Sequence, residues 1–134
     1  MPSCRLDTRK KIVSLEQAVR AIREHPGWVA VTGYFDPLTA EHSRRLREIR
    51  TGHSGIVVFL SDPPDPVLSA RARAELIAAL AMVDYVVLPQ ERASSGSSLL
   101  DAGLPVLREE EADEARFKNL LRRVQERHKT ALER

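Results

Sequence analysis

The chain has 134 residues, of which 43% are hydrophobic and 4% aromatic; this length suits one hydrophobic core, so we expect a single domain over residues 1–134. Its formal net charge is +2, with 21 basic and 19 acidic residues. The chain therefore lacks the strong positive field that nucleic-acid binding usually needs. Cys4 is the only cysteine and the longest apolar run is too short for a membrane span, so we expect a cytoplasmic protein without disulfides or membrane contact.

The first third of the chain predicts an arm, a helix and a buried strand. Residues 1–13 carry mixed charges without a clear period, so we expect an arm of uncertain order. Ser14 and Gln17 have the spacing of a capping box, which predicts a helix that ends at His25-Pro26-Gly27. The apolar and β-branched run over residues 28–32 is typical of a strand buried on both faces of a parallel sheet.

The middle of the chain continues this alternation. Apolar side chains at helical spacing predict a helix over residues 38–50, and residues 56–60 (IVVFL) predict a second strand. The alanine-rich stretch 69–83 predicts a further helix, and residues 84–88 (DYVVL) predict a third strand.

The last part of the chain predicts a loop, an edge strand and a long helix. The serine-glycine segment 94–98 could cap a short helix that ends near Gly103, and residues 105–107 predict a fourth strand at an edge. The final helix, over residues 110–134, has an acidic first turn and basic later turns, which complement its own dipole. Its basic face is expected to be solvated, while its apolar side could continue past the domain and form a homodimer contact.

Strands that alternate with helices indicate an α/β protein. We expect a three-layer, Rossmann-like fold with a mostly parallel sheet of four to five strands and helices on both faces.

Such sheets bind ligands at the carboxyl ends of their strands. Residues 33–42 lie between the first strand and the next helix, where free N–H groups and the helix dipole attract anions. There, His42 could donate to a phosphate oxygen.

The segment GYFDPLTAEH, residues 33–42, resembles the signature of the nucleotidylyltransferase superfamily, in which a strand runs into Gly-x-Phe-Asp-x-x-His-x-Gly-His. The segments KIVSLEQAVRAI, WVAVTGYFD, VVFLSD and RAELIAALAMVDYVVLP extend the resemblance over roughly residues 10–90. They follow the order found in the adenylyltransferase domain of ADP-heptose synthases, and cytidylyltransferases that act on glycerol 3-phosphate are more distantly similar. The resemblance implies transfer of a nucleotide to a sugar or polyol phosphate, with Mg²⁺ carried in by the nucleoside triphosphate.

The resemblance also implies roles for particular residues. His42 and Thr39 stand at the two histidine positions and would be the catalytic pair. A nucleotide- or substrate-binding role follows for Gly33, Tyr34, Phe35, Asp36, Ser61, Asp62 and Arg73. No metal held by the protein itself is expected, because the four histidines lack metal-ligand spacing with carboxylates.

Several of these residues also have structural interpretations. Asp36 could make a local turn bond before Pro37, and Tyr34 and Phe35 could belong to the core. Arg73 could point into the cleft or away from it. Glu41 could simply complement the dipole of its helix as an acid in the first turn.

The chain departs from the family pattern in three phosphate-contacting elements: the signature, the loop after the second strand and the start of the final helix. In the signature, Thr39 replaces the first histidine and Glu41 replaces the glycine. If the Glu41 carboxylate lay about 4 Å from a phosphate charge, the repulsion would be roughly 4 kcal/mol at an effective dielectric near 20. Ser61-Asp62 is followed almost directly by Pro66, so the family's phosphate-binding lysine has no counterpart. The final helix opens with acids where the family has serine and threonine.

Two functions therefore remain open. The first is a nucleotidylyltransferase of doubtful catalytic competence. The second is a non-catalytic module of the same fold that binds a nucleotide, a sugar phosphate or a protein partner.

Overall fold

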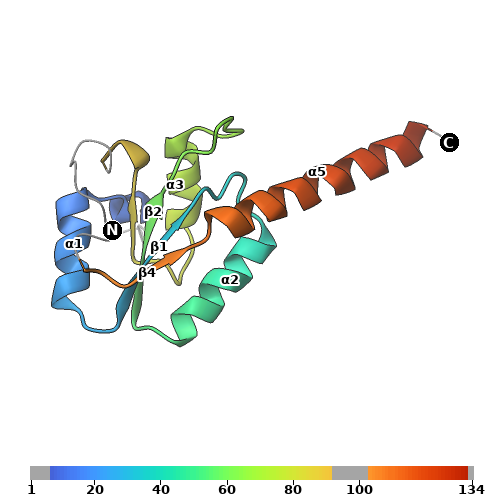
Figure 1. The fold of residues 1–134 in the computed structure, drawn as a ribbon. Coiled ribbons are helices and arrows are strands. Elements are labelled where there is room, and N and C mark those ends of the chain that lie inside the picture. Colours follow the sequence, from blue (N-terminus) through green and yellow to red (C-terminus); the bar gives the residue numbers. More distant parts are fainter. Residues whose placement is uncertain (1–6, 92–102, 133–134) are drawn as a thin grey trace, which may run out of the picture.

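The computed structural model describes residues 7–91 and 103–132, which form an α/β fold around one parallel sheet (Figure 1). Its four strands have the order β3-β2-β1-β4, with β1 (Trp28–Gly33) and β2 (Gly55–Leu60) in the centre. β3 (Tyr85–Val87) and β4 (Val106–Arg108) lie at the two ends of this order, and every pairing is parallel. The predicted fold class and parallel sheet are confirmed.

Helices cover both faces of the sheet and make the fold three-layered. α1 (Leu15–Glu24) packs on one face, whereas α2 (Ala40–Thr51) and α3 (Ala70–Ala78) pack on the other. Because successive strand residues point to opposite faces, the sheet separates two cores. The α1 core contains Ala18, Ile22, Ala30, Val57, Phe59 and Val87. The other core includes Val29, Val31, Leu46, Ile56, Val58 and Ile77.

The N-terminal region is more ordered than its mixed charges suggest. Residues 8–11 form a 3₁₀ turn, η1 (Thr8–Lys11), and Asp7 accepts a hydrogen bond from the N–H of Arg9 at its start. Ile12 then pairs with Val86 beside the sheet. The expectation of an arm of uncertain order is thus wrong for residues 7–13, because the backbone there finds partners in β3. The predicted capping box is present: the Ser14 hydroxyl accepts from the N–H of Gln17, and the Gln17 side chain accepts from Ser14.

Element boundaries differ from the predictions by a few residues. α3 ends at Ala78 rather than near residue 83, because the chain must turn to bring Asp84 to β2, where its N–H and carboxylate bond the Ile56 backbone. α2 begins at Ala40 with Thr39 as its N-cap. The serine-glycine segment 94–98 lies outside the described residues. Among the described helices, none is long and apolar enough to cross a membrane.

The last helix, α5 (Glu110–Leu132), determines the shape of the molecule. One residue separates it from β4, so its first turns lie at the carboxyl edge of the sheet. Its second half extends away from the domain (Figure 1), and residues 121–132 are all exposed. α5 therefore has one end built into the domain and one end in solvent.

Candidate functional site

Three segments meet at the carboxyl edge of the sheet. They are the turn between β1 and α2, the end of β2 at Ser61-Asp62, and the first turns of α5. Parallel strands end at the same edge, which is why residues far apart in sequence come together here. The turn, Ser61, Asp62 and Arg73 were all expected at this place.

The turn after β1 binds a carboxylate of the same chain. Oδ2 of Asp113 accepts hydrogen bonds from the backbone N–H of Tyr34 at 2.8 Å and of Phe35 at 3.3 Å. Gly33 makes room for it, because a β-carbon at this position would lie 2.7 Å from that same oxygen. The space beside Gly33, a residue assigned to nucleotide or substrate binding, is thus occupied by Asp113.

A second carboxylate binds the neighbouring hydroxyl groups. Glu110 accepts from the Thr32 hydroxyl through Oε2 and from the Ser61 hydroxyl through Oε1, both at 2.9 Å. Glu109 is buried beside it and bonds Nε of Arg45 at 2.9 Å, which raises the pKa of that guanidinium. The acidic first turn of α5 thus lies within the site.

His42 is enclosed by protein groups on both sides of its ring. Its side chain is 3% exposed, Nδ1 accepts from the N–H of Thr39 at 3.0 Å, and the Thr39 hydroxyl lies 2.9 Å from the same nitrogen. Nε2 lies 2.8 Å from Oδ1 of Asp113, without the alignment of a hydrogen bond. The ring also packs against Phe35, with centroids 5.2 Å apart.

The space next to the His42 ring is small. A cavity of about 10 Å³ lies between the turn and α5, with His42, Asp113 and Arg116 among its lining residues. This volume suffices for about one water molecule and no phosphate group. Arg116 also bonds Oδ1 of Asp113 at 2.8 Å, so the buried carboxylate is bound from two sides.

Arg73 connects the ends of the two central strands. The buried guanidinium donates to the carbonyl oxygens of Tyr34 and Ser61, both at 2.9 Å, and of Leu68 at 3.2 Å. Its remaining contact is Oδ1 of Asp62 at 2.6 Å. The Arg73 side chain thus holds the ends of β1 and β2 together through their backbone carbonyl groups.

The aromatic and acidic residues of the turn have separate roles. Phe35 is buried in the core with its backbone in the left-handed region at φ 48°, whereas Tyr34 lines a cavity. Asp36 accepts from the backbone N–H groups of Val67 and Leu68, at 2.6 and 2.8 Å, ahead of α3. The structural interpretation of Asp36 as a local turn bond is wrong, because its partners lie 31 and 32 residues away in the sequence.

The larger cavity of the site is acidic. It has a volume of about 310 Å³, with Tyr34, Phe117 and two prolines as apolar walls. Its charged residues are Asp36, Asp65, Asp113, Glu114 and Lys118. Partial burial, followed by the charge of Glu114, raises the pKa of the Tyr34 hydroxyl. An aromatic cavity with four carboxylates and one lysine does not attract phosphate.

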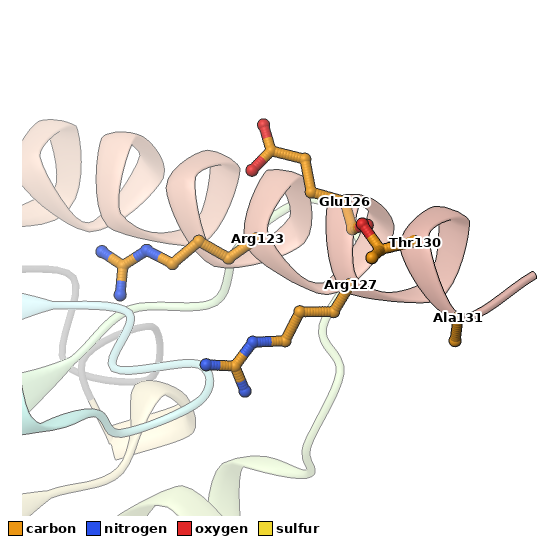
Figure 2. A pocket seen from close by; sticks show the side chains of 5 residues that line it. All are labelled: Arg123, Glu126, Arg127, Thr130 and Ala131. Carbon is orange, nitrogen blue, oxygen red and sulfur yellow. The ribbon is translucent and has the colours of Figure 1, made fainter. Parts of the chain in front are cut away.

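A second hollow lies along the outer half of α5. It has a volume of about 440 Å³, and the residues that line it are Arg123, Glu126, Arg127, Thr130 and Ala131 (Figure 2). The two arginine side chains extend from the same side of the helix (Figure 2). Arg123 also contacts Glu41 of α2 at 3.2 Å, so this acid pairs with α5.

Sequence reasoning missed part of the site. It assigned no contact role to Thr32, Arg45, Glu109, Glu110, Asp113 or Arg116. The available signal was the acidic first turn of α5, which had been interpreted as a complement to the helix dipole and as a source of repulsion. In the described ranges, no cluster of three or more histidine, cysteine, aspartate or glutamate side chains could hold a metal ion.

The fold and the site define a Rossmann-like α/β domain in which the turn after β1 binds a carboxylate of the same chain, Asp113. No protein-family model and no curated protein matches the chain. The residues of the chain and their geometry therefore carry the functional argument.

Proposed function

We propose that the chain is a nucleotidylyltransferase-like domain that does not transfer nucleotides and acts as a protein-interaction module. The resemblance of residues 33–42 to the superfamily signature supports the relationship, as does the parallel α/β fold. The observation that carries the loss of transfer is the hydrogen bonding of Asp113 to the N–H groups of Tyr34 and Phe35.

A phosphate would have to compete for these groups. It would need to displace Asp113 from the turn while Glu110 holds the hydroxyls of Thr32 and Ser61. Each carboxylate that remained about 4 Å from a phosphate charge would cost roughly 4 kcal/mol at an effective dielectric near 20, close to three decades in affinity. Nucleotides and sugar phosphates are therefore poor ligands for this end of the sheet.

A protein partner fits the remaining surface better. The exposed half of α5 offers apolar side chains and basic groups outside the domain. We propose the cytoplasm as its location, since a single cysteine suits a reducing compartment. The alternative is an active transferase in which His42 contacts the triphosphate and Mg²⁺ enters with the nucleotide.

Calorimetric titration separates these two functions. ATP or CTP with Mg²⁺ should give no saturable heat at millimolar concentration, and no pyrophosphate should appear when sugar phosphates are added. Saturable binding, together with pyrophosphate release that disappears in His42→Ala, would establish the transferase and overturn the proposal.

A further inference from the structure

The acidic cavity beside Tyr34 has the size and the walls of a binding site. Its volume is about 310 Å³, and ligand pockets in proteins measure roughly 300–1,000 Å³. Its apolar walls come from separate segments: Tyr34 from the turn after β1, Pro63 and Pro64 from the loop after β2, and Phe117 from α5. A ligand with an aliphatic stem would bury that stem against these walls.

Two carboxylates at this cavity are unpaired within the part of the chain that the structure describes. Asp65 and Glu114 both line the cavity and are exposed, and neither takes part in a hydrogen bond or an ion pair there. Asp36, which also lines it, is fixed in place by the N–H groups of Val67 and Leu68. The cavity therefore offers free acceptors next to a carboxylate that is already held in position.

The charge of the cavity stays negative after its internal pairs are counted. Arg116 contacts Asp113 at 2.8 Å and offsets its charge. Lys118 is the one basic residue among those that line the cavity, and it faces the charges of the three remaining carboxylates. The pKa of the Tyr34 hydroxyl is raised by partial burial and then by the charges of Glu114, Glu110 and Asp113. A cation is the ligand that such a field attracts.

The walls indicate which kind of cation fits. Proline and aromatic side chains are poor ligands for a hard metal ion, which prefers a full shell of oxygen atoms. Aromatic rings attract organic cations through their negative faces. A guanidinium is planar, more weakly hydrated than an ammonium, stacks on aromatic rings and donates two parallel hydrogen bonds to a carboxylate. An arginine side chain thus matches both the aromatic walls and the free carboxylates.

We propose that this cavity binds an arginine side chain of a protein partner. The guanidinium lies against Tyr34 and Phe117 and pairs with Asp65 and Glu114, while its aliphatic stem packs along the prolines. The inference rests on the proposed role as a protein-interaction module and deepens it, because it names the chemistry by which the partner is recognised.

A nuclear magnetic resonance titration of the full, ¹⁵N-labelled chain tests the ligand. The probe is an acetylated and amidated glycine–serine peptide with one central arginine. It should shift the amide signals of residues 34–36, 65 and 113–118 in a saturable manner. The same peptide with lysine should bind at least about threefold more weakly, since an ammonium stacks less well on aromatic rings. The citrulline peptide, which has the shape of arginine without its charge, should not bind.

Substitutions in the cavity test the contacts. Asp65→Asn with Glu114→Gln should weaken binding of the arginine peptide about tenfold or more, because both charged acceptors are lost. Phe117→Leu should weaken it about threefold through loss of one ring. Glu24→Gln with Glu111→Gln is the matched control, since it removes the same charge from exposed positions that do not line the cavity. The spectrum of each variant also shows whether it is folded.

Four results would overturn the proposal. They are an absence of saturable shifts, shifts spread over acidic residues on both faces of the domain, an equal loss of affinity in the control variant, and equal binding of the citrulline peptide. Calcium chloride that displaced the peptide and produced the same shifts would assign the cavity to a metal ion instead and would also overturn it. None of these probes contains phosphate, so nucleotide binding would overturn the proposed loss of transfer, whereas a failure of arginine binding would overturn this inference alone.

Discussion

Gly33 and Asp113 lie so close that a β-carbon on the glycine would be 2.7 Å from the carboxylate oxygen Oδ2. The same oxygen receives the N–H groups of Tyr34 and Phe35. A side chain at position 33 would therefore compete with the carboxylate for the space in the turn.

Substitution of this glycine should destabilise the fold. Gly33→Ala is expected to lower the free energy of unfolding by about 1–3 kcal/mol, the usual cost of overpacking. Urea denaturation measures this change. Gly52→Ala serves as the control, because the nearest atom to a β-carbon there is 3.8 Å away and the backbone φ is −94°. Equal stabilities for the two variants would contradict the close contact.

Neutralising the internal carboxylates should open the turn to anions. Glu110→Gln with Asp113→Asn removes two negative charges and keeps the shapes of the side chains. We expect inorganic pyrophosphate to bind at least about tenfold more tightly to this variant than to the native chain, as charge repulsion falls. Isothermal titration gives the affinities.

The control for this gain is the neighbouring pair of acids. Glu111→Gln with Glu114→Gln removes the same charge from exposed positions of the same turn. Similar pyrophosphate affinities for both double variants would attribute the effect to net charge and contradict a specific role of Glu110 and Asp113.

Loss of the Arg73 guanidinium should weaken the contact between β1 and β2. Arg73→Leu leaves the carbonyl oxygens of Tyr34 and Ser61 without this donor, so we expect a loss of about 3 kcal/mol in the free energy of unfolding. Arg71→Leu on the same helix should change it by less than about 0.5 kcal/mol, because Arg71 is exposed and its pair with Glu75 lies on the surface. Thermal or urea unfolding compares the two, and a neutral Arg73→Leu would show that the buried contacts contribute little.

The Tyr34 hydroxyl should titrate above its ordinary pKa of 10.0. A raised folded-state pKa means that the folded chain keeps this proton longer than the unfolded one, so stability falls as pH rises above about 10. Ultraviolet absorbance of tyrosinate in the native chain, compared with Tyr34→Phe, isolates its titration. Glu114→Gln should lower the midpoint, since the charge of Glu114 is the second cause of the shift after burial. A midpoint at or below 10 would contradict the acidic character of the cavity.

Local sequence patterns were sufficient for most of the architecture. The spacing of Ser14 and Gln17 predicted a capping box that is present, and the β-branched run 28–32 predicted the central strand. Patterns failed where a distant partner decides the conformation. Ile12 joins the sheet because Val86 is beside it, and α3 stops early because Asp84 bonds the Ile56 backbone.

The position of the site was predictable from the sequence, but some of the residues that form it were not. The end of a first strand and the start of a helix identified residues 33–42, but Asp113 reaches Tyr34 across 79 residues of sequence. No periodicity or motif relates these two positions. The sequence showed that the acidic first turn of α5 is unfavourable to phosphate. That this helix places a carboxylate in the turn after β1 depends on the path of β4 along β1.

Because a single residue links β4 to α5, Asp113 is a tethered ligand of the turn. A tethered group has an effective concentration of millimolar or more. To displace it, a dissolved metabolite must bind the turn more tightly than the carboxylate does or be present at a higher concentration. Changes in cellular nucleotide levels should therefore leave the occupancy of this turn unaffected. Only a movement of α5 as a whole would release it.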